Sequence, residues 1–296
     1  MKIMNIVTKL RKCLEVIEMW QESYNNNPTL YIVPTPIGNL EDMTTRAINV
    51  LKSVDVIFSE DTRVTSQLLN YFNIKNKLIH MDDHNEEDVK YKVEAFLKEN
   101  NNVAIVTDRG TPIISDPGYK TVKYLREKGY NVVALPGPCA FVPALVSSGI
   151  SSEHFTFYGF LSSKEKKMHD ELMYLKDSDY TLVFYEAPHR ILKTLNAMLE
   201  IFGDRYISIS REISKLHESI FVGYLSDAIN TINVKGEFVI VVEPSRDKIL
   251  NDMSIFENVT LYIKSGLSSM DAIKKVAKER KIPKSDVYKE FIERSK

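Results

Sequence analysis

Clusters of glycine and proline follow short β-rich runs four times in the first half of this chain, at residues 34–39, 108–112, 116–118 and 136–140. Glycine lets a backbone approach a ligand closely, and proline makes a loop rigid. Ligands of open α/β sheets bind outside the carboxyl ends of the strands. Any one cluster is consistent with an ordinary tight turn. Four clusters at successive strand ends predict a preformed ligand site.

The segments around these clusters alternate between β-rich runs and runs with helical periodicity, which predicts βαβ units and a mainly parallel sheet. The expected strands are Leu30–Val33, Val54–Phe58, Val103–Thr107 and Val132–Leu135. The expected helices between them are Thr44–Leu51, Thr62–Tyr71, Val89–Leu97 and Tyr119–Lys128.

A second series of elements follows, in which some strands are consecutive. The expected strands are Phe155–Tyr158, Tyr180–Tyr185, Tyr206–Ser210, Ser219–Gly223 and Phe238–Val242, and the expected helices lie at Glu165–Leu175 and Ile191–Ile201. Strands that follow one another without a helix, as near residues 210–223, predict a mixed sheet.

A chain of 296 residues exceeds the usual size of one domain, so we expect two α/β units. The expected divisions are an N-terminal helical extension at 1–27, a first unit at 28–148, a second unit at 149–244 and a helical tail at 245–296. From Lys264 onward the tail has ten Lys/Arg and five Asp/Glu, so it is locally basic.

Several classes of protein are disfavoured by composition. The formal net charge of −1 argues against a globally basic nucleic-acid binder, so any RNA contact must be regional. The two cysteines, Cys13 and Cys139, form no CxxC pair, which favours a reducing cytoplasm without disulfides or zinc.

No apolar run approaches the roughly 20 residues that span a bilayer. We therefore expect a cytoplasmic protein with no membrane partner. The absence of GxGxxG and GxxxxGK[ST] disfavours a dinucleotide or nucleotide-phosphate cradle.

Six segments occur in a recognisable order: VPTPIGNLEDMTTRA, SEDTRVT, DRGTPIISDPG, LPGPCA, YEAPHR and GEFVIVVEP. Together, from Leu30 to Glu243, they resemble the 16S ribosomal RNA cytidine 2'-O-methyltransferase family, a branch of the tetrapyrrole (corrin/porphyrin) methylase superfamily. The resemblance implies two α/β subdomains of that type with S-adenosylmethionine in the cleft between them. It also implies a homodimer that methylates a ribose 2'-hydroxyl in small-subunit rRNA, either free or in the 30S subunit.

The resemblance also implies which residues bind the cofactor. These are Pro36, Gly38, Asp108, Gly110, Cys139, Ala140, Tyr185, Glu212 and Glu237. The chain departs from the usual pattern at Pro34, Arg109 and Cys139, where a small residue, alanine and serine are common. A further departure is Asp82, which stands where members of this family often have histidine. Arg109 has two interpretations, a contact to RNA phosphate or an outward position in solvent.

Methyl transfer to a hydroxyl depends mainly on alignment, and a carboxylate or imidazole that accepts the proton accelerates it further. The candidate proton acceptors are Glu60, Asp61, His84, Glu86 and Glu186, of which Glu60, Asp61 and Glu186 form the predicted catalytic set. Asp61 also fits the N-cap position of the helix that follows it. The sequence leaves these two roles for Asp61 open.

RNA contacts are expected to combine basic side chains with a stacking aromatic residue. The predicted RNA-binding residues are Arg63, His189, Arg190, Lys274, Lys275, Lys278 and Lys281. Tyr288 is the candidate for stacking. The opposing interpretation is that the lysines form a solvated helix face and that Arg190 forms a salt bridge at an interface.

Two other functions remain open at this point. A methylase of a tetrapyrrole or another small molecule would have the same fold and cofactor, although the basic tail and the DRGTPIISDPG and YEAPHR segments argue against it. A non-catalytic ribosome- or RNA-binding protein with this fold is the other alternative. Binding of S-adenosylmethionine distinguishes the second alternative from the two methylases.

Overall fold

The structure is a computed structural model that describes residues 20–23, 25–245, 253–280 and 282–294. Most of the N-terminal helix expected from the sequence lies outside the described residues. The chain divides into two compact units, which are Met1–Ala140 with Ile213–His217, and Phe141–Glu212 with Glu218–Lys296.

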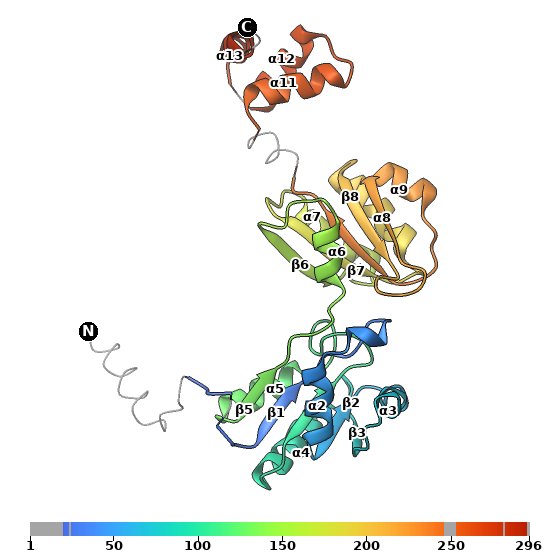
Figure 1. Cartoon of the computed structure of the whole chain (residues 1–296). Helices are drawn as coiled ribbons and strands as arrows, with labels where there is room; N and C mark the ends of the chain where they lie inside the picture. The colour runs from blue at the N-terminus through green and yellow to red at the C-terminus, as the bar shows by residue number, and fades with distance from the viewer. Residues whose placement is uncertain (1–19, 24, 246–252, 281, 295–296) are drawn as a thin grey trace, which may run out of the picture. The chain divides into compact units, whose positions relative to one another are not determined.

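The first unit contains a sheet of five strands in the order β3-β2-β4-β1-β5 (Figure 1). The strands are β1 (Thr29–Ile32), β2 (Val56–Ser59), β3 (Leu78–His80), β4 (Val103–Val106) and β5 (Asn131–Ala134). Every pairing in this sheet is parallel, which confirms the sequence prediction. The carboxyl ends of all five strands therefore meet at one edge.

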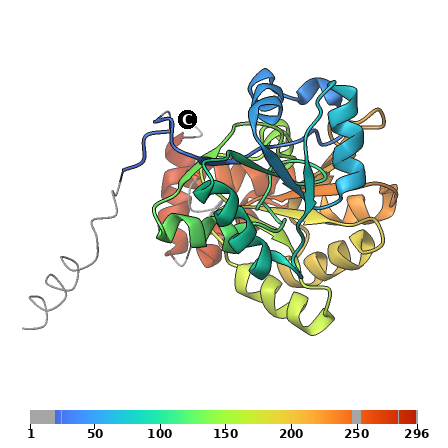
Figure 2. The same ribbon diagram turned by 90° about the horizontal axis from the view of Figure 1, so that it is seen from below.

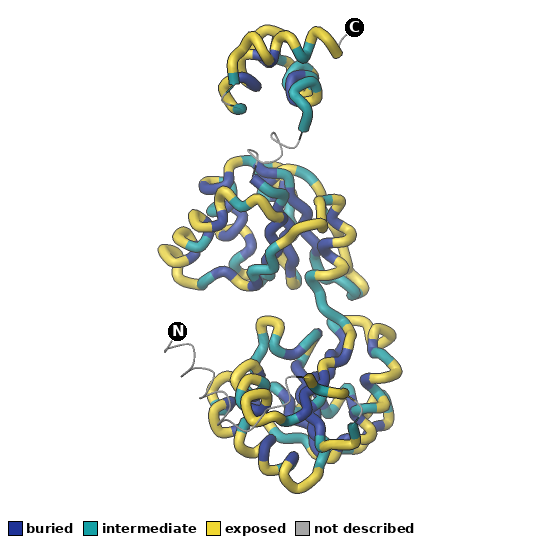
Figure 3. The backbone as a smooth tube through the Cα atoms, turned by 90° about the vertical axis from the view of Figure 1, so that its left-hand side faces the viewer, coloured by how far each residue is buried: buried dark blue, intermediate teal, exposed yellow. Residues whose placement is uncertain are grey.

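Helices cover both faces of this sheet (Figures 1 and 2). The helices are η1 (Leu40–Asp42), α2 (Thr45–Ser53), α3 (Thr62–Tyr71), α4 (Glu86–Lys98) and α5 (Tyr119–Glu127). Alternate residues of each strand belong to two separate cores: Phe58 packs with α4 and α5, whereas Ile57 packs with α2 and α3. Because both faces are covered, β2 and β4 are buried throughout, and such strands read as continuous apolar runs (Figure 3).

The second unit contains a mixed sheet in the order β6-β7-β10-β8-β9. The strands are β6 (Phe155–Phe160), β7 (Thr181–Glu186), β8 (Tyr206–Arg211), β9 (Ser219–Tyr224) and β10 (Phe238–Val242). Strands β6 and β7 are parallel, and the other pairs are antiparallel. The sequence prediction of a mixed sheet is confirmed.

The helices of the second unit are α6 (Phe141–Ser147), α7 (Glu165–Leu175), α8 (Ile191–Phe202) and α9 (Leu225–Thr231). Helices α7, α8 and α9 bury the apolar residues of one sheet face in a single core. Helix α6 packs against β7 and β10 and belongs to this unit. The two units therefore divide after Ala140, eight residues before the division expected from the sequence.

The tail contains three helices, α11 (Ile255–Lys264), α12 (Ser269–Glu279) and α13 (Lys284–Arg294). They enclose a small core of their own that includes Val259, Ile273 and Val287. Ser254 and Glu257 form a reciprocal capping box at the start of α11. The helical character expected for the tail is confirmed. None of the helices in the described ranges has the length and apolar character needed to cross a membrane.

Candidate functional site

The loops after β1, β4 and β5 are joined to one another by hydrogen bonds at the carboxyl edge of the first sheet. Thr35 and Gly110 form an isolated antiparallel bridge, with N–H to carbonyl distances of 2.9 and 3.0 Å. The Thr35 hydroxyl donates to the Thr107 carbonyl at 3.0 Å, and the Thr111 hydroxyl donates to the Pro138 carbonyl at 2.8 Å. Three of the four predicted Gly/Pro clusters are therefore linked directly, as a preformed site requires.

Close packing between side chains and glycines tightens the same edge. A Cβ atom on Gly137 would lie 2.6 Å from the Pro34 Cβ, so the proline ring occupies the space of the missing side chain. A Cβ atom on Gly38 would lie 2.2 Å from Lys215 Cγ, so the stem of Lys215 lies directly on the first loop. The departure at Pro34 thus has a packing reason. Pro36 is buried within the same loop.

Carboxylates gather around the ends of β2 and β4. The Thr107 hydroxyl donates to Glu60 Oε2 at 2.9 Å, and Asp108 Oδ1 accepts from the Asp61 backbone N–H at 2.9 Å. Burial and the neighbouring Glu60 raise the pKa of Asp116 to about 7, against a hydrogen bond from Thr107 that lowers it. Sequence reasoning did not select Asp116, although its DPG cluster was a signal.

The loop that holds Asp116 has an unusual backbone. Ile113 and Ser115 have φ values of +76° and +70°, in the left-handed region that residues other than glycine rarely adopt. A Cβ atom on Gly118 would lie 2.9 Å from Ile113 Cγ1 and 3.6 Å from Met81 Cε, so these two side chains occupy the space beside the glycine. The loop is therefore held in one strained conformation by its surroundings.

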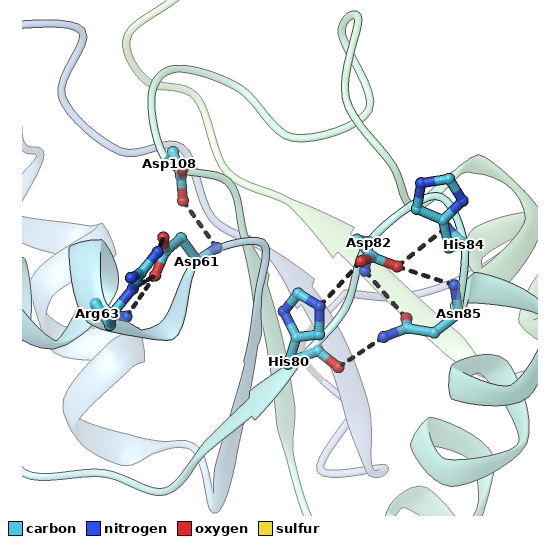
Figure 4. A network of polar contacts seen from close by, with 7 residues as sticks. All are labelled: Asp61, Arg63, His80, Asp82, His84, Asn85 and Asp108. Carbon is cyan, nitrogen blue, oxygen red and sulfur yellow. Dashed lines mark hydrogen bonds and ion pairs between the residues drawn. The ribbon is translucent and has the colours of Figure 1, made fainter.

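Asp61 has the geometry of a helix cap. It is the N-cap of α3, and its Oδ1 accepts from the Arg63 backbone N–H at 2.8 Å. The Arg63 guanidinium also bonds both carboxylate oxygens, at 3.0 and 2.6 Å (Figure 4). These hydrogen bonds from Arg63 hold the pKa of Asp61 far below its usual range. A carboxylate with so low a pKa is a weak proton acceptor.

A histidine–aspartate pair lies at the end of β3 (Figure 4). His80 Nε2 is 3.0 Å from Asp82 Oδ2, and Asp82 Oδ1 accepts from the backbone N–H groups of His84 and Asn85 at 3.0 and 2.9 Å. The Asn85 backbone hydrogen bond and the His80 ring lower the pKa of Asp82. His80 was not among the sequence-predicted residues.

Glu86 is buried, and its Oε1 accepts from the Thr121 backbone N–H at 3.0 Å in the first turn of α5. An acidic group at this place stabilises the helix, because it accepts a hydrogen bond from a backbone N–H of the first turn and its negative charge interacts favourably with the positive end of the helix dipole. This contact joins α4 to α5 and supports the loop that contains Asp116.

In the second unit, predicted cofactor residues lie at one edge of the sheet. Tyr185 is the penultimate residue of β7 and pairs with Val239 near the start of β10, and its hydroxyl accepts from the Phe141 backbone N–H at 3.3 Å. Glu212 and Glu237 exchange contacts: the Glu212 N–H donates to the Glu237 carbonyl at 2.9 Å, and Glu212 Oε1 accepts from the Glu237 N–H at 2.8 Å. Strand register brings these three residues together.

Glu186 and Arg190 form a buried network in the second unit. The Glu186 side chain is fully buried and accepts from the Ala187 N–H at 2.8 Å and from the Thr194 hydroxyl. Arg190 Nε is 3.4 Å from Glu186, and its Nη2 donates to the Leu161 and Ser162 carbonyls at 2.9 and 3.1 Å. These contacts give both side chains a structural role. The predicted catalytic and RNA-binding roles of the pair stay predictions.

The remaining predicted residues lie at the surface. Lys274, Lys275 and Lys278 are exposed on one face of α12. Lys275 also lies over the Tyr262 ring, 4.2 Å from its centre. Lys281 is outside the described residues. Arg63, Arg109 and His189 are also exposed, and Cys139 is half-buried. In the part of the chain described by the structure, no His/Cys/Asp/Glu group is arranged to hold a metal.

The fold matches known methylases. The sequence model of the Tetrapyrrole (Corrin/Porphyrin) Methylases family matches residues 29–229. A uroporphyrin-III-C-methyltransferase from Thermus thermophilus superposes with a TM-score of 0.53 at 19% identity, covering 73% of this chain and 94% of the other. A cobalt precorrin-4 methyltransferase superposes with a TM-score of 0.55 at 16% identity, covering 76% and 98%. The class of the protein is thus a methylase of the tetrapyrrole type.

Curated relatives define the family more narrowly. The ribosomal RNA small subunit methyltransferase I of Bacillus subtilis (strain 168) is 45% identical, over 88% of this chain and 92% of the relative. The proteins of that name from Halalkalibacterium halodurans and Vibrio cholerae are 42% and 45% identical, over 90% and 75% of this chain and 97% and 80% of their own. The chain belongs to the ribosomal RNA small subunit methyltransferase I family, which confirms the resemblance found in its motifs.

Proposed function

We propose that this protein transfers a methyl group from S-adenosylmethionine to the 2'-oxygen of a cytidine ribose in small-subunit ribosomal RNA. The names of the relatives support the substrate class. The observation that carries the proposal is the edge of the first sheet, where the loops after β1, β4 and β5 are joined through Thr35, Gly110 and Thr111. The three Gly/Pro clusters joined at this edge all lie within segments of the family resemblance.

The residues of this edge fit the chemistry of the cofactor. S-adenosylmethionine carries ribose hydroxyls and an ammonium group, which carboxylates and backbone carbonyls bind well. Asp108 and the backbone of Pro36, Gly38 and Gly110 are held in rigid loops that supply such groups. We assign the same cofactor to Cys139, Ala140, Tyr185, Glu212 and Glu237.

The bound cofactor supplies an electrophilic methyl group on a positively charged sulfur. The protein has to hold the ribose oxygen in line with that methyl group and exclude water. Alignment of this kind lowers barriers by roughly 7–11 kcal/mol in the best intramolecular cases. Loops joined by hydrogen bonds lose little conformational freedom on binding, so they suit this task.

RNA binding is assigned to two kinds of surface residue. The exposed lysines Lys274, Lys275 and Lys278 on α12 provide charge for the phosphate backbone, and Tyr288 provides a ring that is 48% exposed for stacking. Arg63 and His189 are exposed, and they belong to the proposed set together with Arg190 and Lys281. We further propose that the protein forms a homodimer and acts in the cytoplasm. Sedimentation velocity of the purified protein tests the dimer.

The test is calorimetric titration with S-adenosylmethionine, followed in the same preparation by radiolabelled methyl transfer to 30S subunits that lack modifications. The expected result is binding, with the label in one 2'-O-methylated cytidine. Parallel reactions with naked 16S rRNA distinguish free RNA from the assembled subunit. Binding without RNA labelling would instead support a tetrapyrrole or other small-molecule acceptor. Absence of binding would support a non-catalytic ribosome-binding protein.

A further inference from the structure

His80 lies at the same edge of the first sheet as the joined loops. It is the last residue of β3 and pairs in register with Ser59, the last residue of β2. Glu60 follows Ser59 directly in the sequence. The next residue, Asp61, donates its backbone N–H to the Asp108 carboxylate in the loop after β4. The imidazole of His80 is therefore carried to the carboxyl edge by the strand that borders β2 (Figure 4).

The orientation of this imidazole is set by a carboxylate that is itself fixed. Asp82 Oδ2 contacts His80 Nε2, while Asp82 Oδ1 is held by the N–H groups of His84 and Asn85. The Asp82 backbone N–H also donates to Asn85 Oδ1 at 3.0 Å. Of the described residues, none forms a hydrogen bond with His80 Nδ1. When Nε2 carries the proton toward Asp82, Nδ1 has a lone pair that can accept a proton.

In many enzymes a hydroxyl nucleophile is activated by a general base that a third group holds in position. His80 and Asp82 have the geometry of such a base and the group that orients it. The carboxylate fixes the tautomer and stabilises the imidazolium that forms when the ring takes a proton. The His80 side chain is 53% exposed, so an external hydroxyl can reach it. Neither a buried histidine nor an unoriented surface histidine would combine these properties.

Two other carboxylates of the first unit are less suited to accept a proton. Arg63 occupies both oxygens of Asp61, and the Thr121 N–H engages the buried Glu86. Burial and the neighbouring Glu60 raise the pKa of Asp116 to about 7, so this carboxylate is the rival of His80 as proton acceptor. Asp82 itself stands where the family resemblance led us to expect histidine. The chain thus has a carboxylate at that position and an imidazole two residues earlier.

We infer that His80, oriented by Asp82, accepts the proton of the ribose 2'-hydroxyl during methyl transfer, an inference that rests on the proposed function. The ribose oxygen forms a bond to the methyl carbon while the carbon–sulfur bond breaks and leaves its electron pair on sulfur. The hydroxyl proton passes to Nδ1 of His80. The positive charge that begins on the sulfonium ends on an imidazolium beside the Asp82 carboxylate, so atoms and charge balance.

The test measures single-turnover methyl transfer to unmodified 30S subunits by the full-length protein and by His80→Ala. General-base catalysis is worth about 10²–10⁴-fold, so the rate constant should fall by that factor. Calorimetric affinity for S-adenosylmethionine and the melting temperature should remain as in the wild type. Added imidazole should restore part of the rate to His80→Ala and leave the wild type unaffected. Asp82→Asn should also be slower, but by a smaller factor than His80→Ala.

The matched control is His169→Ala, which removes an exposed histidine of α7 and should retain the full rate. An unchanged rate in His80→Ala would overturn the inference while leaving the proposed function intact. A slow His80→Ala variant that imidazole does not rescue, and that melts at a lower temperature, would assign His80 a structural role instead. Failure of the wild type itself to label RNA would refute the proposed function, a result distinct from both.

Discussion

The two α/β units bring polar residues to a sheet edge by different means. In the first unit, loops meet and bond one another through backbone groups and hydroxyls, as in the Thr35–Gly110 bridge. In the second unit, strand register brings Glu212 beside Glu237, and a buried side-chain network fixes Glu186 and Arg190. Parallel strands place all their carboxyl ends together, whereas a mixed sheet distributes its strand ends over two edges. A converging set of ligand loops is therefore characteristic of the first unit.

Carboxylates show the same contrast in energetic terms. Glu186 has donors for its oxygens and stabilises the second unit, whereas Asp116 is placed near other acids and has a raised pKa. We therefore expect the carboxylates at the edge of the first sheet to lower the free energy of unfolding, whereas Glu186 raises it. The following substitutions test that comparison.

Glu186→Ala should have the largest effect on stability. It leaves the Arg190 guanidinium partly buried without its carboxylate, which costs about 3–5 kcal/mol. Urea unfolding followed by circular dichroism measures the change. Glu165→Gln is the matched control, because it removes an exposed ion pair with Lys193 at 2.8 Å, and exposed ion pairs contribute little to stability. A stable Glu186→Ala variant with no methyl transfer would instead support the catalytic role predicted from the sequence.

Gly137→Ala should have the next largest effect, because the new Cβ would collide with Pro34. Overpacking of this kind costs about 1–3 kcal/mol and should weaken calorimetric binding of S-adenosylmethionine. The double variant Pro34→Ala with Gly137→Ala should recover much of both losses. If the single and double variants are equally impaired, contact with the proline ring is not the reason for glycine at this position.

Asp116→Asn should raise stability in a pH-dependent way. The folded protein holds the Asp116 proton up to a pH of about 7, whereas the unfolded chain releases it near its ordinary pKa of 3.8. Between these values the folded state binds more protons, so wild-type stability falls as pH rises through this window. The asparagine variant should be more stable than wild type by about 1–2 kcal/mol above pH 7, after allowance for solvent screening. The difference should vanish below pH 4. Urea unfolding across this pH range measures it, and a pH-independent difference would contradict the raised pKa.

Asp61→Ala should have the smallest effect, because it removes the N-cap of α3 and an ion pair with the exposed Arg63. Loss of such a cap lowers the free energy of unfolding, because a backbone N–H of the first turn loses its acceptor. Asp61→Asn retains a capping oxygen and should be close to the wild type in urea unfolding. Equal loss in both variants would show that the charge pair with Arg63, rather than the cap, stabilises this helix start.

The sequence predicted those parts of the fold in which local pattern and burial agree. β2 and β4 are buried at every position and appear in the sequence as apolar runs. β3 was missed because it has only three residues, none of them fully buried. α6 was missed because it is short and contains Pro143, which is tolerated in the first turn of a helix. Short elements depend on tertiary packing that no local pattern reveals.

The sequence predicted which loops form the candidate site, but it did not predict which side chains in those loops contact one another. The Gly/Pro clusters marked the edge correctly, because their conformational restrictions are local. The raised pKa of Asp116 depends on its burial and on Glu60, which is distant in sequence, and the orientation of His80 depends on a rotamer that meets Asp82. For Asp61, the sequence left capping and catalysis open, and the hydrogen bond from the Arg63 N–H supplies the capping geometry.

The bridge between Thr35 and Gly110 also has a consequence for the order of folding. It joins residues far apart in the chain, and it can form only after β1 and β4 have paired. Contacts of such long range form late, because the entropy of closing a large loop has to be overcome first. A partly folded chain therefore lacks this edge, and a cofactor that binds there selects the completed first unit over every earlier species on the folding pathway.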